Sequence, residues 1–305
     1  MAGPDVTIAI PTRDRPQLAA RAIASALAQS VQHLEVVVVD DGSAEPLHLP
    51  VRDGRLRIIR RERAGGPCTA RNTAMSAARG HWITFLDDDE ELAPEMVAVS
   101  LRAIGASTLP GPVAALCGVE VVDKDGRVLE TRLPASVPRG GHYPLEDGQR
   151  GRLLNTLVAP LEVMRRIGGW DEGLPAWEHD DLLLRLNAVC SIQGVPTVAY
   201  RVSAHAGPRL SNDLPARARG IERTLTKHRT AFAAHPTRHA YLLGTLGLAH
   251  LRGGRWAPAV AATTRSLMIQ PGLRACGWWV ASLAGPWATS LCDRVRARLA
   301  EGRHA

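Results

Sequence analysis

Three consecutive carboxylates, Asp87, Asp88 and Asp89, follow a short apolar run in this chain of 305 residues. The run, Trp82 to Leu86, is rich in β-branched and aromatic residues, which predicts a buried strand. Adjacent carboxylates repel one another unless a cation neutralises them, and their hard oxygen atoms suit Mn²⁺ or Mg²⁺, which can bridge phosphates. The simpler alternative is a solvated acidic turn before a helix over 93–105, with Pro94 in the first turn of that helix.

Two further apolar runs also end in polar residues. Val6 to Ile10 leads into Pro11-Thr12, and Leu34 to Val39 leads into Asp40-Asp41-Gly42-Ser43. Continuous rather than alternating apolarity favours parallel strands that are covered on both faces. Ligands of open α/β sheets bind at the carboxyl ends of such strands, so we expect these polar groups to share one edge.

Helices and a further strand complete a nucleotide-binding half-sheet. Helices are predicted from Pro16 to about residue 30 and over 68–78, with a strand over 56–59. The order β-α-β-loop-β-α-β is typical of such a half-sheet. The chain has neither a Gly-x-Gly-x-x-Gly motif nor a P-loop. We therefore expect a metal and Arg71 to contact the phosphates of a bound nucleotide.

Composition narrows the class of protein. Apolar residues make up 45% of the chain and charged residues 22%, which is typical of a globular protein with one large α/β unit and an appendage. The net charge of +7 favours anionic partners, but the arginines are dispersed, so no nucleic-acid partner is predicted. The five cysteines lack zinc-ligand spacing, and no signal-peptide h-region follows Met1. Both features predict a cytoplasmic protein with reduced thiols.

Four motifs together resemble the family 2 glycosyltransferases of the GT-A fold, over roughly residues 5–212. They are Ile8-x-Ile10-Pro11-Thr12-Arg13-Asp14-Arg15, Val38-Val39-Asp40-Asp41-Gly42-Ser43, Ala70-Arg71-Asn72 and Phe85-Leu86-Asp87-Asp88-Asp89. The resemblance implies an α/β catalytic domain over 1–214. Its Rossmann-like nucleotide-binding half is 1–105, its acceptor-binding half is 106–214, and an α-helical C-terminal region follows over 215–305.

The resemblance also implies a nucleotide-diphospho-sugar donor, Mn²⁺ or Mg²⁺ as cofactor, and inversion at the anomeric carbon. Asp41 would accept a hydrogen bond from the base, and Arg71 would lie near the diphosphate. Asp87 and Asp89 would be the acidic metal motif, and Asp88 would lie near the ribose or the sugar. The first strand's end would line the nucleotide-sugar site with Pro11, Thr12, Arg13 and Asp14.

A catalytic base is implied further along the chain. Gly169-Trp170-Asp171-Glu172 and Glu178-His179-Asp180-Asp181 resemble the family's Gly-Gly-Phe-Asp-Glu segment and its following Glu-Asp motif. Alignment places Glu178 on the family's Glu and His179 on its catalytic Asp, whereas a shift of one residue offers Asp180. A neutral imidazole is a competent base near neutral pH, but we favour Asp180 slightly over His179. Capping of a helix is the alternative role for Asp180 or Asp181.

Two segments of the second half remain open. Val113 to Val122 and Val128 to Arg132 predict a β-hairpin. Residues 134–151 are rich in proline, glycine and charge, which fits either a loop over the site or a surface excursion. His205 lies in a segment that resembles the end of the family's catalytic domain. It is either a ligand of the metal or diphosphate or a surface residue.

The C-terminal region predicts a helical hairpin over 241–251 and 256–268. Residues 275–292 carry tryptophans and no charge before Asp293, and arginines follow. The segment is a poor membrane span. It suits peripheral contact of 275–303 with an anionic membrane, at the inner face of the plasma membrane, or packing of the hairpin onto the catalytic domain.

The leading hypothesis is a metal-dependent inverting glycosyltransferase of glycan, cell-surface polysaccharide or glycosylated natural-product synthesis. Its acceptor would be a glycan, a lipid-linked sugar, a protein or a small molecule. One alternative is a catalytically impaired GT-A-like scaffold subunit, which His179 in place of an Asp favours. The other is a nucleotidyltransferase, although Pro11 to Arg15 lacks the glycines of such enzymes.

Overall fold

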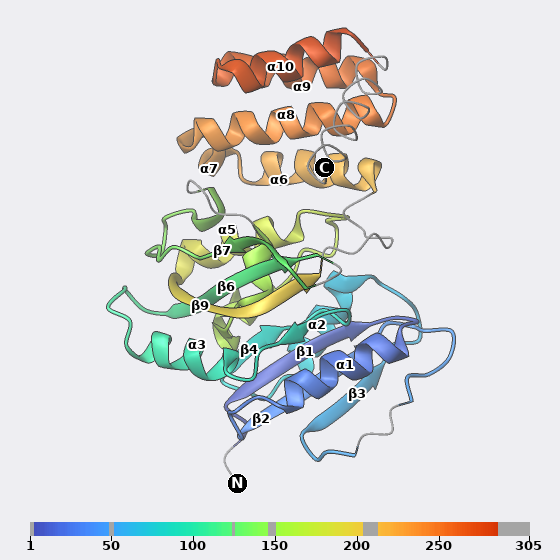
Figure 1. The fold of residues 1–305 in the computed structure, drawn as a ribbon, viewed down its shortest axis with the longest axis vertical. Helices are drawn as coiled ribbons and strands as arrows, with labels where there is room; N and C mark the ends of the chain where they lie inside the picture. Colours follow the sequence, from blue (N-terminus) through green and yellow to red (C-terminus); the bar gives the residue numbers. More distant parts are fainter. Residues whose placement is uncertain (1–2, 49–51, 124–125, 146–150, 204–212, 286–305) are drawn as a thin grey trace. The chain divides into compact units, whose positions relative to one another are not determined.

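A computed structural model describes residues 3–48, 52–123, 126–145, 151–203 and 213–285. The chain divides into two compact units. Unit 1 comprises residues 1–144, 148–173 and 178–206, and unit 2 comprises 145–147, 174–177 and 207–305. Figure 1 shows sheets in the first unit and stacked helices in the second.

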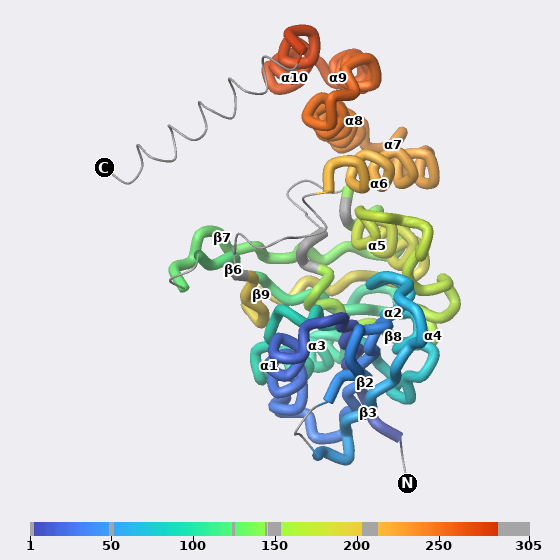
Figure 2. Tube along the Cα trace, turned by 90° about the vertical axis from the view of Figure 1, so that its right-hand side faces the viewer, coloured from blue at the N-terminus to red at the C-terminus, as the bar shows by residue number. Residues whose placement is uncertain are grey.

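A five-stranded sheet with the order β3-β2-β1-β4-β8 forms the first half of unit 1. Its parallel strands are β1 (Val6–Thr12), β2 (Leu34–Asp40), β3 (Leu56–Arg60) and β4 (Trp82–Phe85), and β8 (Ala159–Pro160) is antiparallel to β4. Every residue of β1 and β2 is buried. Helices α1 (Pro16–Leu27) and α2 (Pro67–Ala77) both pack on these strands and cover the sheet from its two sides (Figure 2). The expected parallel half-sheet is confirmed.

A second sheet has the order β5-β9-β6-β7. The long strands β6 (Val113–Val122) and β9 (Ser191–Ser203) run parallel, and β7 (Val128–Arg132) pairs with β6 as the predicted hairpin. Helix α3 (Met96–Gly105) packs on β6 and β9, while α4 (Leu161–Arg166) and α5 (Glu178–Val189) follow η2 (Gly151–Thr156).

The predicted start of α3 is wrong. Pro94 does not open the helix, which begins at Met96. Glu91–Leu92 form β5, which pairs with β9, and the Ala93 N–H donates to the Ala199 carbonyl at 3.1 Å. This pairing keeps the chain extended past the acidic triplet, and the helix starts only after the pairing ends.

The described part of the predicted loop over 134–151 packs onto neighbouring elements. The Val137 N–H donates to the Ile192 carbonyl at 2.8 Å, and the Tyr143 N–H donates to Asn187 Oδ1 at 2.8 Å. Tyr143 lies in the short helix η1 (Tyr143–Leu145) and is buried. Residues 137–143 are therefore a packed excursion rather than a lid, and residues 146–150 lie outside the described ranges.

Unit 2 consists of α6 (Leu214–Lys227), α7 (Arg229–Ala234), α8 (Pro236–Arg252), α9 (Trp256–Ile269) and α10 (Leu273–Leu283) in its described part. The predicted hairpin is confirmed as α8 and α9. Trp278 of α10 packs against α8 because position 244 is glycine: a Cβ there would meet the Trp278 ring at 1.8 Å. Trp279 Nε1 donates to Thr264 Oγ1 at 3.0 Å. Both tryptophans thus pack on the hairpin. Residue 287 lies outside the described residues.

Candidate active site

The acidic triplet follows β4. It lies against the hydroxyl of Thr12, at the end of β1, and against the guanidinium of Arg15. Thr12 Oγ1 donates to Asp88 Oδ2 at 2.8 Å. Arg15 NH1 lies 3.2 Å from Asp88 Oδ1 and 3.5 Å from Asp89 Oδ2. Burial, opposed by the Thr12 bond and Arg15, raises the pKa of Asp88 above its ordinary value. The solvated acidic turn is therefore excluded for Asp88, which is buried.

The end of β2 holds its two carboxylates in a turn. Asp41 is buried and accepts the N–H groups of Gly65 and Gly66, at 3.0 and 2.7 Å, and the guanidinium of Arg61. Asp40 accepts the Ser43 N–H at 2.9 Å. Asp41 thus fixes the loop that begins α2, in addition to any contact with a nucleotide base.

The remaining residues of the first motif line the same edge. Pro11 is buried and pairs with Val39. Asp14 Oδ1 accepts the Ala44 N–H at 2.7 Å and the Asp14 N–H donates to Ser43 Oγ at 2.9 Å, so this residue ties the first strand's end to the second. The Arg13 side chain is 57% exposed and lies 3.4 Å from Asp14.

Arg71 is the buried cation of the site. Its side chain is 5% exposed, and NH2 donates to Asp87 Oδ1. Nε and NH1 are buried without a hydrogen-bond partner, while the guanidinium carbon lies 4.4 Å from the centre of the Trp170 ring. Burial alone would raise the pKa of Asp87, but Arg71, His179 and Arg15 together hold it below its ordinary value. Asp87 therefore stays ionised beside Arg71, whose Nε and NH1 groups have no hydrogen-bond acceptor.

Asn72 joins the α2 motif to the segment after Gly168. Its Nδ2 donates to the Trp170 carbonyl at 2.9 Å, and its Oδ1 accepts the Trp170 N–H at 2.9 Å. We call this pair of bonds the Asn72 clasp. Nδ2 also donates to Glu172 Oε1 at 2.8 Å, and Thr69 donates to Glu172 Oε2 at 3.0 Å. Two motifs that are about 100 residues apart in sequence thus form one structure.

The clasp places Trp170 between β4 and α5. The Trp170 ring makes edge contacts with Phe85, at a centroid distance of 5.2 Å, and with His179, at 5.4 Å. His179 Nε2 lies 3.7 Å from Glu178 Oε1. Both side chains interact electrostatically with the cluster: His179 with Asp87, and Glu178 with Arg71.

The two aspartates that follow are more buried. Asp180 is 9% exposed, and successive residues of a helix point about 100° apart, so it points to a different side of α5 from His179. Asp181 is fully buried and accepts both Nε and NH2 of Arg185, at 2.9 and 2.7 Å. Asp181 is thus committed to an ion pair within α5. Of the predicted metal ligands, His205 lies outside the described residues.

The donor set fits a divalent ion only in part. No group of three or more His, Cys, Asp or Glu side chains converges among the described residues. Asp87 and Asp89 remain partly exposed, with 30% and 26% of their side chains accessible. Two carboxylates are sufficient for Mg²⁺ or Mn²⁺ when a bound diphosphate and water supply the other ligands. The residues present therefore fit a divalent ion only together with ligands from a bound nucleotide or water.

Sequence reasoning did not assign roles to Arg15 and Trp170. Arg15 belongs to the first motif, and a positive charge at the end of the first strand is the sequence feature that indicates contact with the acidic triplet. Trp170 followed two glycines and came before two carboxylates, but its contact with Arg71 spans almost 100 residues of sequence. Only the fold reveals such a contact.

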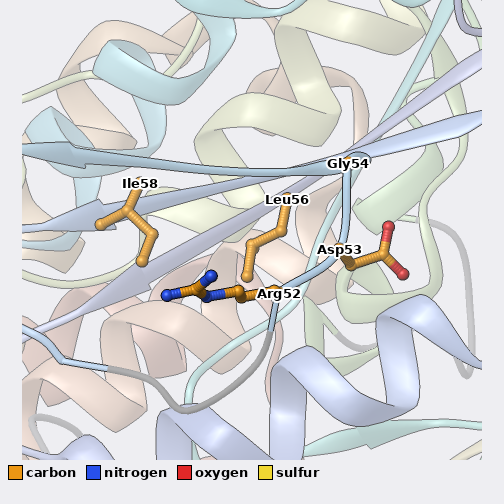
Figure 3. Close-up of a pocket in the computed structure, with 5 residues that line it drawn as sticks. All are labelled: Arg52, Asp53, Gly54, Leu56 and Ile58. Atoms are coloured by element: carbon orange, nitrogen blue, oxygen red, sulfur yellow. The ribbon is translucent and has the colours of Figure 1, made fainter.

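One surface pocket lies away from this site, at the edge strand β3. It has a volume of about 570 Å³ and is lined by Arg52, Asp53, Gly54, Leu56 and Ile58. Figure 3 shows Leu56, Ile58 and Arg52 bordering it, with the Asp53 carboxylate turned away. None of these residues belongs to the predicted site.

Comparison with known sequences identifies relatives of the first half. A family model described as Glycosyl transferase family 2 matches residues 7–135. Succinoglycan biosynthesis protein ExoO of Rhizobium meliloti (strain 1021) is 39% identical over 139 residues, which cover 45% of this chain and 39% of that protein. The pre-mycofactocin glycosyltransferase of Mycobacterium tuberculosis (strain CDC 1551 / Oshkosh) is 28% identical over 200 residues, which cover 60% of this chain and 39% of that protein. The chain thus spans about two fifths of the length of these curated relatives.

A solved structure shares the fold over most of the chain. S. aureus TarS 1-349 in complex with UDP-GlcNAc superposes with a TM-score of 0.55 at 16% identity, covering 92% of this chain and 79% of that one. Another crystal structure of S. aureus TarS 1-349 gives a TM-score of 0.53, covering 91% of this chain and 90% of that one. This likeness is one of fold, and it includes most of the C-terminal helical region.

Proposed function

We propose that this chain, whose residues 7–135 match the Glycosyl transferase family 2 model, transfers a sugar from a nucleotide-diphospho-sugar to an acceptor hydroxyl. The relative ExoO is a succinoglycan biosynthesis protein, which favours a polysaccharide or its lipid-linked precursor as the acceptor. The UDP-GlcNAc complex of TarS supports a nucleotide-sugar donor.

One observation carries the proposal. Arg71 is buried against Asp87 and Trp170 and keeps two N–H-bearing nitrogens without hydrogen-bond partners. Buried donors of this kind are costly unless a ligand accepts from them, and a diphosphate offers oxygens to a guanidinium. In this arrangement Arg71 binds and orients the leaving diphosphate. Mn²⁺ or Mg²⁺ on Asp87 and Asp89 would neutralise charge on the same group.

The base takes the proton of the acceptor hydroxyl while its oxygen attacks the anomeric carbon and the nucleotide diphosphate leaves from the opposite side. This displacement inverts the configuration. We assign the base to His179 rather than Asp180, because His179 contacts Trp170 and interacts with Asp87, next to the diphosphate site. Trp170 fixes the imidazole against the donor half.

A thermal-shift panel of nucleotide sugars, with and without Mn²⁺, tests the donor site. We expect one donor to raise the melting temperature only when the metal is present, because ligands stabilise the state that they bind. Asp89→Ala should abolish this rise, whereas Glu162→Ala, at a side chain that is 87% exposed, should retain it. A folded wild-type chain that responds to no donor would overturn the proposal and favour a scaffold role.

A further inference from the structure

Helix α10 leaves an apolar stripe exposed on one side. Leu273, Val280 and Leu283 are 95%, 57% and 45% exposed, and Cys276 is exposed between them. Their spacing of three or four residues places them on one face of the helix. The opposite face, with Ala275 and Ser282, is buried in the unit. The stripe is therefore a contiguous surface rather than scattered exposed residues.

Arginines adjoin both ends of the stripe in the sequence. Arg274 follows Leu273, and its guanidinium carbon lies 6.0 Å from the centre of the Tyr241 ring. At the other end, Trp256 Nε1 donates to the Ser282 carbonyl at 2.6 Å, and Arg255 precedes Trp256 in the chain. The Trp256 ring is 53% exposed, so an aromatic side chain extends the apolar stripe at this end.

The charge of the chain is divided unevenly. Residues 213–285 contain ten arginines or lysines against two carboxylates, whereas residues 1–212 contain 23 basic and 26 acidic side chains. The helical region is thus strongly cationic, and the catalytic region is nearly neutral. Such asymmetry indicates an anionic surface as the partner of the basic part.

We propose that the α10 stripe and its flanking arginines dock the chain on an anionic membrane surface. Leucine, valine and tryptophan side chains enter the boundary of headgroups and acyl chains, and the arginines bind lipid phosphates. A soluble polyanion would bind the arginines but not the apolar stripe. A second copy that packed on the same stripe would bring like charges together. This docking is independent of the proposed sugar transfer, because it needs neither donor nor acceptor.

Co-sedimentation of the full chain with vesicles tests the proposal. We expect binding to phosphatidylcholine vesicles that contain about one third phosphatidylglycerol, little binding to pure phosphatidylcholine, and release by high salt. The triple variant Leu273→Ser, Val280→Ser, Leu283→Ser should weaken binding at least about tenfold. A control variant, Val128→Ser with Leu129→Ser, changes exposed apolar residues of β7 and should bind like wild type.

A second pair of variants tests the charges. Arg255→Gln with Arg274→Gln should weaken binding several-fold, and Arg102→Gln with Arg127→Gln, exposed arginines of unit 1, should not. Circular dichroism establishes that each variant is folded. Three results overturn the proposal: no binding to the anionic vesicles, undiminished binding by the triple variant, or a dimer that the triple variant dissociates in the absence of vesicle binding. If neither the wild type nor the triple variant binds vesicles, and both bind soluble polyphosphate with equal affinity, the arginines form a polyanion site instead.

Discussion

Two arginines lie against the acidic triplet. Arg71 pairs with Asp87, and Arg15 lies near Asp88 and Asp89. The charge of the three carboxylates is therefore partly neutralised by guanidinium groups of the chain itself. A metal that binds Asp89 has to compete with a guanidinium that already lies near the carboxylate.

Removal of Arg15 is expected to strengthen metal binding. Arg15→Gln removes the cation that lies 3.5 Å from Asp89, so the affinity for Mn²⁺ should rise about three- to tenfold. Titration followed by the electron paramagnetic resonance of free Mn²⁺ measures this without any substrate. Arg21→Gln, in α1 and paired with Glu91, is the control. Unchanged affinity in Arg15→Gln would show that the arginine does not compete with the ion.

The base assignment makes its own prediction. His179→Ala should lower the rate of donor hydrolysis or transfer about 10²- to 10⁴-fold, because a general base contributes on that order. The thermal shift produced by the donor should persist, since His179 is assigned to proton transfer and not to donor binding. Asp180→Asn should lower the rate much less. The reverse ranking of the two variants would transfer the role to Asp180.

At the scale of elements, the turn between α4 and α5 sets the position of Trp170. Gly168 and Gly169 both have positive φ, at 81° and 62°. They differ in the room for a side chain. A Cβ at 168 would meet no atom within 4 Å, whereas a Cβ at 169 would lie 2.5 Å from Asn72 Oδ1. Close packing of Gly169 on Asn72 is what allows the clasp to form.

This pair of glycines provides a matched test. Gly168→Ala should cost about 1 kcal/mol of unfolding free energy, from the left-handed backbone alone. Gly169→Ala should cost about 1–3 kcal/mol more, because the methyl group displaces Asn72. Urea denaturation of both variants gives the difference. Equal costs would mean that the clasp adapts without loss.

At the scale of the whole molecule, the two units should differ in their response to acid. His250 of unit 2 is buried, and its Nε2 lies 3.1 Å from Glu222 Oε1. Burial lowers the pKa of His250 below its ordinary 6.5, with Arg255 acting in the same direction and Glu222 against it. The folded unit therefore prefers neutral His250. The stability that this preference contributes is present above pH 6.5 and is lost as pH falls through the folded pKa.

Asp40 and Asp87 of unit 1 respond at lower pH. The pKa values of Asp40 and Asp87 are below the ordinary 3.8, so their contribution is lost only as pH falls below that value. Acidification from pH 7 to about 5 should thus lower the melting temperature of the helical unit first. His250→Gln should flatten this dependence, and His81→Gln, at an exposed residue of unit 1, should not. Differential scanning calorimetry from pH 7.5 to 5 measures both.

The sequence predicted the strands that short apolar runs define. Val6 to Ile10 and Leu34 to Val39 are uninterrupted apolar runs, and both are strands buried on two faces. Charge repulsion within Asp87-Asp88-Asp89 predicted a divalent metal ion, and this stays a prediction. The sequence did not indicate that Arg15 and Arg71 would lie beside these carboxylates, because their proximity depends on how β1, α2 and β4 meet. The start of α3 was missed for a related reason, since β5 pairs with a strand more than 100 residues away.

The Asn72 clasp also bears on recombination between homologous chains. Its two bonds go to the backbone of residue 170, so any residue except proline at that position satisfies it, whereas position 72 must keep a side chain that both donates and accepts. Hybrids that take residues 1–105 from one parent and the remainder from another should therefore reassemble when the first parent supplies asparagine at 72. The two bonds tolerate sequence divergence at position 170 in the second parent, but the ring at 170 also contacts Arg71 and Phe85 from the first parent, so the residue type there has to suit both parts.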